Sequence, residues 1–405
     1  MTPAPDLQVE ADFPPSRHAA LERLADFAPR AGRAYELGRN TDPGPGRPAA
    51  VSRLSPYVSR RLITEQEIVT AILARHRFES AEKYVQEVLG RTYWKGWLEM
   101  RPSVWTRFLE TRDRSRDELA DARALADAER GATGIEGFDD WAQELVRTGY
   151  LHNHARMWFA SIWIFTLGLP WALGADFFLR HLIDADAASN TLSWRWVAGL
   201  QTPGKTYLAT TANIERHTEG RFAPRGLATV AVPLTEAPVS PARPLAPLQR
   251  PDLRQPFLLL VTPEDLNPES LLPDGAAIQG VVVVADPALS WGEAGQRFTQ
   301  AAAADTASRA GRHFGCPVRL SDRLAPSDLA DAAQGAGARQ ILTAFAPVGP
   351  TAWALAQLSP DLAQAGTSLT QVRRDWDQAF WPGADRGFFA FKERIPGVLA
   401  DLGTS

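Results

Sequence analysis

The segment from residue 151 to residue 197 constrains the fold more than any other part of the chain. Its sequence is LHNHARMWFASIWIFTLGLPWALGADFFLRHLIDADAASNTLSWRWV. Arg156, Asp184 and Asp186 lie in it among five tryptophans. Charged groups inside an apolar, aromatic region must be paired or bind something polar, because burying them alone is costly. The segment therefore predicts a cofactor site as well as a hydrophobic core.

The same segment contains an uncharged run, residues 158–175, whose eighteen residues reach the lower limit for a membrane span. Pro170 would interrupt a helix inside this run, and Asp176 follows it directly. We therefore expect a buried helix and turn, and no association with a membrane.

Length and composition set the outer limits. A chain of 405 residues with 45% hydrophobic and 22% charged residues is typical of a globular protein of two or three domains. Cys316 is the single cysteine, which excludes an internal disulfide and a cysteine-ligated cluster, and no metal site is predicted. No secretion signal is visible at the N-terminus, so we expect a cytoplasmic protein.

The chain divides into two parts of different texture. Residues 15–228 predict helices, because segments such as LITEQEIVTAILARHR have apolar residues three and four positions apart. Residues 229–256 predict an extended linker, since seven prolines lie between Pro233 and Pro256. Residues 257–405 predict an α/β domain with a parallel, Rossmann-like sheet: short apolar runs at 257–262, 280–287 and 340–345 and the CPVRL segment alternate with helices near 292–313 and 326–337.

Three motifs in the helical part carry a family resemblance. They are VSRLSPYVSRRLI (51–63), TGIEGFDDWAQELVRTGYLHNHARM (133–157) and LIDADAASNTLSWRW (182–196). In order and spacing, over about 190 residues, they resemble the flavin-binding domain of the DNA photolyases and cryptochromes. The resemblance implies an all-α FAD-binding domain and a response to blue light.

The resemblance also implies which residues contact FAD. Arg156 and Asp184 match the family's buried ion pair beside the isoalloxazine, Asp186 the acid near the ring edge, and Asn190 the residue that faces flavin N5. The positions that match the diphosphate segment and the residues that close over it are Ser52, Arg53, Leu54, Ser55, Tyr35 and Arg39. The further pocket positions are Glu87, Arg91 and Asn153.

The chemistry of these residues agrees with the implied roles, but each has a plainer alternative. Hydroxyls and a guanidinium at Ser52, Arg53 and Ser55 suit a phosphate. Either serine could instead be an ordinary helix N-cap, and Asn190 could cap a helix end.

Tryptophans would relay electrons to the flavin of such a protein. Trp194 matches the proximal member of the family's tryptophan chain and Trp171 the middle one. The segment that matches the distal member, 112–132, contains no aromatic residue. A terminal donor would then be Trp94, Trp97 or Trp105, and the alternative role for any of these rings is core packing.

The sequence contains features for and against DNA binding. Trp196 and Met157 match lesion-pocket residues, whereas Gly90 stands where the family has a stacking tryptophan and His154 where it commonly has arginine. The net charge of −4 and pI near 6.0 do not suggest strong phosphate binding, which depends on clustered Lys and Arg. A local patch could come from Arg53, Arg60, Arg61, Arg75 and Arg77, or these could be a solvated helix face.

The α/β part comes after the helical part, whereas photolyases and cryptochromes have it first. FWPGADRGFFAFKERIP (380–396) resembles the end of the family's own α/β domain, so a circular permutation is one explanation and an unrelated α/β module is the other. Residues 257–405 contain no glycine-rich phosphate loop, and an antenna chromophore cannot be predicted from them.

Three functional classes stay open. The first is a DNA photolyase, a light-dependent carbon–carbon lyase that repairs pyrimidine dimers, with damaged DNA as partner. The second is a cryptochrome-like photosensor with an unidentified signalling partner, and the third is a dark FAD-binding protein.

Overall fold

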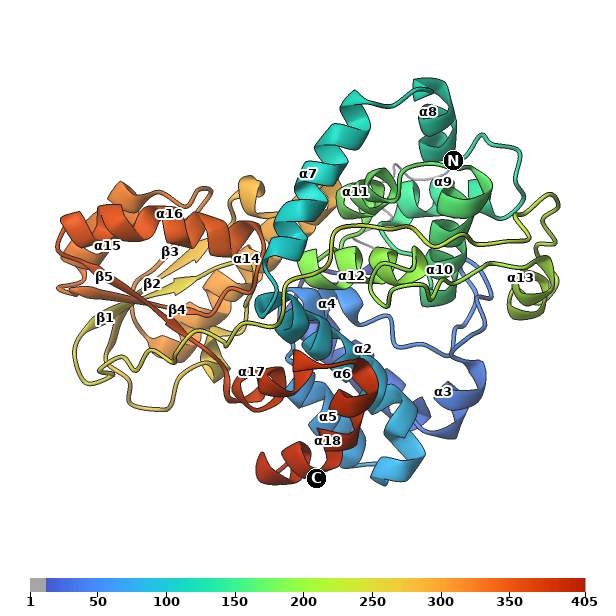
Figure 1. Cartoon of the computed structure of the whole chain (residues 1–405). Coiled ribbons are helices and arrows are strands. Elements are labelled where there is room, and N and C mark those ends of the chain that lie inside the picture. Colours follow the sequence, from blue (N-terminus) through green and yellow to red (C-terminus); the bar gives the residue numbers. More distant parts are fainter. Residues whose placement is uncertain (1–11, 405) are drawn as a thin grey trace, which may run out of the picture.

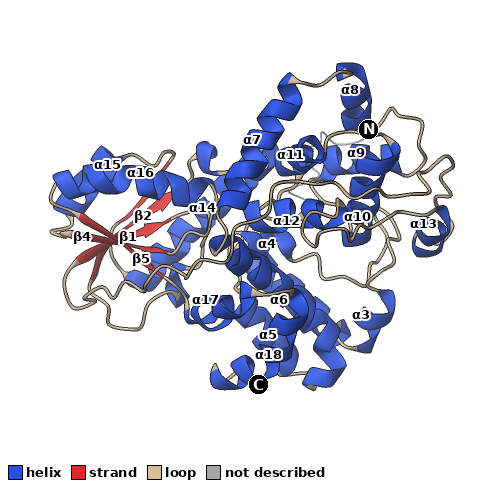
Figure 2. Ribbon diagram, in the orientation of Figure 1, coloured by secondary structure: helices blue, strands red, loops and turns tan. Residues whose placement is uncertain are grey.

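The computed structural model describes residues 12–404, which form a helical part and one five-stranded sheet lying side by side (Figure 1). All strands lie at one end of the molecule (Figure 2). The predicted fold class, a helical domain followed by a parallel α/β domain, is confirmed.

Helices that precede the sheet make up the first part. In chain order they are α2 (Arg17–Phe27), α3 (Arg33–Gly38), α4 (Ser55–Ser59), α5 (Glu65–Leu73), α6 (Phe78–Glu99), α7 (Ser103–Asp117), α8 (Ala122–Arg130), α9 (Phe138–Thr148), α10 (Asn153–Ser161), α11 (Trp171–His181), α12 (Ala187–Val197) and α13 (Thr211–His217). Short turns η1 (Ala28–Arg30) and η2 (Ile162–Thr166) extend α2 and α10.

The second part alternates strands with helices. Its elements are β1 (Phe257–Val261), η3 (Pro268–Ser270), β2 (Ile278–Val284), η4 (Pro287–Leu289), α14 (Glu293–Phe314), β3 (Val318–Ser321), α15 (Pro326–Gly335), β4 (Gln340–Ala344), α16 (Pro350–Gln364), β5 (Ser368–Val372), α17 (Asp375–Phe380), η5 (Trp381–Asp385) and α18 (Phe388–Asp401). The strands are all parallel, in the order β3-β2-β1-β4-β5. The sequence did not predict α16, which contains Pro360, or the partly exposed β5.

The two faces of the sheet have different neighbours. Side chains alternate along a strand, so Leu258 and Leu260 of β1 pack with the apolar residues of α15 and α16. Phe257, Leu259 and Val261 point the other way and belong to the core that also fills the helical part. Burial on both faces explains why the central strands are continuous apolar runs rather than alternating ones.

The uncharged run at 158–175 is a helix, a π-helical turn and the start of a second helix. The chain breaks between η2 and α11, around Gly168 and Pro170, as expected. Among residues 12–404, no helix is long and apolar enough to cross a membrane.

Residues 229–256 contain no helix or strand. They lie along the helical part, where Leu234 N–H donates to Ala198 O at 3.0 Å and Arg243 N–H donates to Met100 O at 3.0 Å. After the sheet, α17 and α18 return to the helical part and pack against α6 (Figure 1). The division of the chain at 229–256 stays a prediction, as does the circular permutation.

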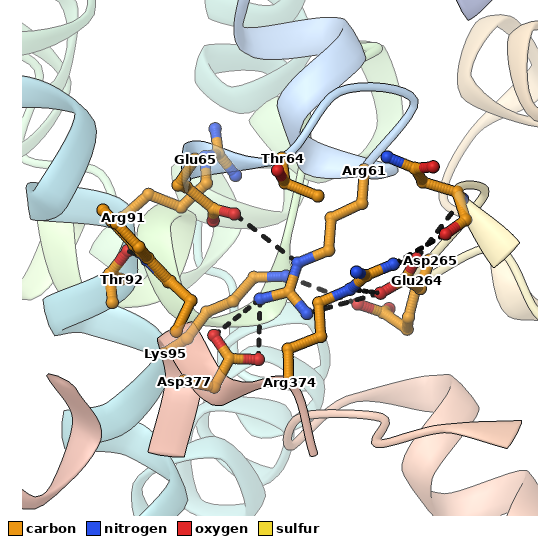
Figure 3. Close-up of polar contacts among 12 residues, drawn as sticks. Arg61, Thr64, Glu65, Arg91, Thr92, Lys95, Glu264, Asp265, Arg374 and Asp377 are labelled. Carbon is orange, nitrogen blue, oxygen red and sulfur yellow. Dashed lines mark hydrogen bonds and ion pairs between the residues drawn. The ribbon is translucent and has the colours of Figure 1, made fainter. Parts of the chain in front are cut away.

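A buried cluster of charges joins the two parts (Figure 3). Its centre is Arg61, which donates to both carboxylate oxygens of Asp377 at 2.7 and 2.8 Å. Asp265, after β1, lies 3.5 Å from Arg61 and accepts from Arg374 at 2.6 and 2.7 Å, and Glu65 lies 3.5 Å from Arg61. The side chain of Arg61 is 3% exposed and that of Asp377 is 1% exposed. Because a buried cation needs its anions, this cluster fixes α17 and the loop after β1 on the helical part.

Substitution Asp377→Asn should lower the free energy of unfolding by about 3 kcal/mol, which is the lower end of the usual cost of breaking a buried ion pair. The lower end is expected because Arg61 keeps Asp265 and Glu65 as partners. Urea unfolding followed by circular dichroism measures this change. The matched control is Asp385→Asn, whose side chain pairs with Arg386 at 3.9 Å on the surface, and it should cost less than about 1 kcal/mol. Equal effects of the two substitutions would contradict the role of the cluster.

Candidate functional site

A cavity of about 630 Å³ lies in the helical part, between α3, the segment before α4, α6, α10 and α12. All the residues predicted to contact a cofactor line it: Tyr35, Arg39, Ser52, Arg53, Leu54, Ser55, Glu87, Arg91, Asn153, Arg156, Asp184, Asp186 and Asn190. Trp194 and Trp196 also line the cavity, whereas Trp171 is not one of its lining residues. Cofactor sites have volumes of about 300–1,000 Å³, so the cavity has the size of one.

Arg156 and Asp184 form a bidentate ion pair in the cavity wall. The two guanidinium nitrogens of Arg156 lie 3.1 and 2.8 Å from the carboxylate oxygens, and its Nε donates to Leu151 O at 2.9 Å. Burial opposes ionisation of Asp184, but Arg156, helped by Arg91 and the Ser55 hydroxyl, holds the pKa of Asp184 below its usual value. The two residues therefore stay charged and keep each other in place, 28 positions apart in the sequence.

The carboxylate of Asp186 makes two contacts at the start of α12. One carboxylate oxygen accepts from Ser189 N–H at 2.7 Å, which is the N-cap bond that the helix needs. The other oxygen pairs with Arg91 of α6. Burial works against the charge of Asp186, but Arg91 and Lys95 hold its pKa below the usual value. The ion pair with Arg91 was not anticipated from the sequence.

Asn190 lies one turn further along α12, inside the helix, so the alternative role as a helix cap is excluded. Its Nδ2 donates to Ala175 O at 2.9 Å. This bond fixes the orientation of the amide beside the cavity.

The segment 52–55 enters α4 through an unusual backbone. Arg53 has φ of +53°, in the left-handed region that non-glycine residues rarely adopt. Its guanidinium lies over the rings of Phe13, at 4.7 Å, and Tyr150, at 4.9 Å. Arg39, which also lines the cavity, lies 3.9 Å from Glu87. The strained backbone of Arg53 and the two rings beneath its guanidinium therefore keep this cation at a fixed place in the cavity wall.

Trp194 is nearly fully buried, with its ring packed against Phe178, at 5.1 Å between centroids, and Trp163, at 6.2 Å. Gly174 of α11 lies directly beneath it. A Cβ on Gly174 would approach the Trp194 ring to 2.3 Å, so only glycine permits this contact. The close packing brings α11, and with it Trp171, against the helix that carries Trp194.

Trp171 continues into a row of aromatic rings. Its ring contacts Phe108 at 5.7 Å, Phe108 contacts Trp105 at 5.3 Å, and Trp105 contacts Trp291 at 5.7 Å. Trp291 precedes α14, so the row crosses from the helical part to the α/β part. Trp291 could not be found from the sequence, because no local pattern connects it with α7.

The two other candidates for a terminal donor lie elsewhere. Trp94 lines the cavity. Trp97 is buried beneath the guanidinium of Arg101, 4.5 Å from its ring. Of the three candidates, Trp105 is the one in contact with the row that begins at Trp171.

Trp196 lies at the open side of the cavity, 37% exposed, and its ring stacks on Tyr207 at 5.7 Å. Met157 and Gly90 line the same cavity. His154 lines it as well, and burial, together with His152 and His217, lowers the pKa of His154 to about 4. His154 is therefore a neutral group near pH 7.

The five arginines for which a DNA-binding patch and a solvated face were the two alternatives do not form one surface patch. Arg60 and Arg61 are both 3% exposed, so they belong neither to a DNA-binding surface nor to a solvated face. Arg75 and Arg77 are exposed and Arg53 lines the cavity. The sequence pattern of helical charges could not distinguish a surface cation from one that meets carboxylates 204 and 316 positions away.

Residues 84–225 match the family model described as the FAD binding domain of DNA photolyase. The chain is 34% identical over 154 residues to a deoxyribodipyrimidine photo-lyase of Streptomyces griseus, covering 38% of this chain and 33% of that protein. It is 31% identical over 215 residues to the enzyme of that name from Thermus thermophilus, covering 52% of this chain and 50% of the other. The chain thus spans between a third and a half of the length of these relatives.

A class III photolyase from Agrobacterium tumefaciens is a similar solved structure, with 26% identity and a TM-score of 0.45 over 54% of this chain and 46% of that one. The matched region contains most of α6 and all of α10 to α12, whereas α3 and the segment before α4, which also line the cavity, lie outside it. Residues 84–225 of this chain are therefore similar to the FAD binding domain of the DNA photolyases.

Proposed function

We propose that the chain binds FAD in this cavity and is a light-responsive flavoprotein. The observation that carries the proposal is the convergence of residues from separate segments, 35–39, 52–55, 87–91, 153–156 and 184–190, on one cavity. Bound FAD would supply a chromophore that absorbs blue light and exchanges single electrons. An antenna chromophore is not part of the proposal.

The residues present fit FAD in charge and in unused hydrogen-bonding groups. Among the described residues that line the cavity, the buried Arg53 Nε, His154 Nδ1 and Trp194 Nε1 have no hydrogen-bond partner. Buried polar atoms are normally satisfied, so these three are groups that a polar ligand would complete. Ser52, Arg53, Ser55, Tyr35 and Arg39 would hold the diphosphate, and Leu54 would pack beside it.

The isoalloxazine would lie on the α10 and α12 side of the cavity. Arg156 and Asp184 would flank it, Asp186 would face the ring edge, and the amide of Asn190 would meet N5. A fixed amide there tunes which redox state of a flavin is stable. Arg91, Glu87 and Asn153 would complete the walls.

Trp194 and Trp171 would carry electrons towards the flavin. The row through Phe108 to Trp105 and Trp291 supports Trp105 as a distal donor in place of the aromatic residue that 112–132 lacks. Each hop would move one electron inward from one tryptophan to the next, so oxidised Trp171 would be reduced by Trp105, with the ring of Phe108 lying between them. A thiol or another reductant in solution would supply the last electron.

Two activities fit this cavity. The first is repair of pyrimidine dimers in DNA by a light-dependent carbon–carbon lyase, favoured by Met157 and the exposed ring of Trp196, which both line the cavity. The second is light sensing without repair, favoured by the absence of a side chain at Gly90 and by the net charge of −4. Among the two, repair is the activity named for the relatives.

Substitution Asp184→Ala should abolish FAD binding, because Arg156 would be left buried without its partner. The flavin absorbance of the purified protein measures this loss. The control is Asp176→Ala, which removes a buried carboxylate that pairs with Arg116 at 2.8 Å and Arg180 at 2.9 Å outside the cavity. Full flavin occupancy in Asp184→Ala, or equal losses in both variants, would count against the assigned cavity.

Substitution Trp194→Phe should slow photoreduction of the flavin at least about tenfold while FAD stays bound. The reason is that the phenylalanine ring, which would replace the first electron donor, is harder to oxidise than the tryptophan ring. Time-resolved absorption after a blue flash gives the rate. Trp105→Phe should slow the recovery of Trp171, and Trp353→Phe, in a ring 70% exposed on α16, should change nothing. Unchanged photoreduction in Trp194→Phe would show that electrons enter by another route.

Illumination with dimer-containing DNA separates the two activities. A photolyase should restore the bases in single-stranded and duplex substrates in proportion to the light dose, with no repair in the dark. Efficient photoreduction with no restored bases would instead favour the photosensor.

A further inference from the structure

We infer that Phe388, which the C-terminal helix α18 brings to the cavity, is a stacking residue for the flat ring of a pyrimidine base in DNA. This inference rests on the proposed function and names a residue that would hold the substrate. Phe388 lines the same cavity as Trp196 and Met157. It is the first residue of α18 and lies 298 positions after Gly90.

The wall of the cavity has a gap at Gly90. A Cβ built on this residue would meet no atom within 4 Å, so the helix α6 presents bare backbone to open space at this turn. Glycine inside a helix costs about 1 kcal/mol relative to alanine, and no close packing at this position requires it. A ring from elsewhere in the chain therefore has room beside this turn.

Phe388 lies next to the following turn of α6. Its ring contacts Tyr93, with centroids 5.3 Å apart, and Tyr93 contacts Trp94 at 5.0 Å. Tyr93 and Trp94 follow Gly90 by three and four positions, which is the spacing of neighbours on one helix face. Phe388 thus supplies an aromatic face on the side of the cavity where Gly90 has none.

The segment that carries Phe388 is held firmly on α6. The Tyr93 hydroxyl donates to Arg386 O at 3.0 Å, and Arg101 donates to Asp385 O at 2.7 Å. Lys392 lies 3.9 Å from Glu82. Contacts on both sides of Phe388 fix its ring before any ligand arrives, so stacking on it requires little further ordering.

A nucleobase is the occupant that this opening favours, and the proposed repair of pyrimidine dimers makes it a pyrimidine. Its lining combines flat or soft apolar groups (Phe388, Trp94, Trp196 and Met157) with the cation of Lys83. Aromatic rings stack on any base face, and a strand that carries the base would bring a phosphate to this cation. Such a cavity binds a base that has left the DNA helix.

Three variants of the full chain test this role, with fluorescence anisotropy in the dark on an oligothymidine that contains one cyclobutane dimer. Phe388→Ala should weaken binding about 5- to 100-fold, which is the usual effect of one stacking contact. Phe388→Leu keeps apolar packing on Tyr93 but loses the flat face, and should weaken binding to a similar extent. Phe389→Ala is the matched control: the neighbouring ring is 82% exposed, and binding should stay within about twofold of the unchanged chain.

A reciprocal change sharpens the test. Gly90→Trp in the Phe388→Ala chain should recover at least half of the lost binding free energy, because the open space beside Gly90 accepts a ring on the same wall. The inference is overturned if Phe388→Ala binds as tightly as the unchanged chain, if Phe389→Ala weakens binding equally, or if the unchanged chain does not prefer the dimer to undamaged oligothymidine. Flavin content is measured on each sample: a chain without FAD contradicts the proposed function, whereas the comparison of Phe388 with Phe389 still decides the inference.

Discussion

The burial of cations whose anions come from the other part of the chain is the constraint on which this structure depends. Arg60, Arg61 and Lys95 are each 3% exposed in the helical part. Lys95 lies 3.5 Å from Glu264, and Arg61 meets Asp265 and Asp377 (Figure 3). Removing these carboxylates would leave buried cations short of partners, at a cost of several kcal/mol each. The helical part therefore needs the sheet and α17 in order to be stable.

The same constraint links the interface with the cavity. Burial lowers the pKa of Arg60, against the opposing effect of Glu264, Asp186 and Asp184, so its guanidinium lies in the field of both regions. Arg91 pairs with Asp186 at the cavity wall. Positive and negative side chains thus alternate from the loop after β1 to the start of α12. They hold the cavity wall with the proposed flavin contacts at a fixed position relative to the sheet.

The sequence grouped the candidate site residues far better than it indicated the contacts that support them. The residues 35–39, 52–55, 87–91 and 153–190 lie in motifs with fixed spacing, and all those named as cofactor contacts line one cavity. Periodicity likewise predicted the central strands, because burial on both faces makes them continuous apolar runs. Trp291 and Phe388 could not be found in this way, since each meets its neighbours only after the chain has folded back over more than 180 positions.

The proposed function depends on the binding of FAD. The direct measurement is the visible absorption spectrum of the purified chain, followed by heat release and identification of the bound flavin. If the chain binds FAD as proposed, the protein is yellow and releases FAD in a ratio near one per chain. A colourless protein that stays colourless after incubation with FAD would contradict it.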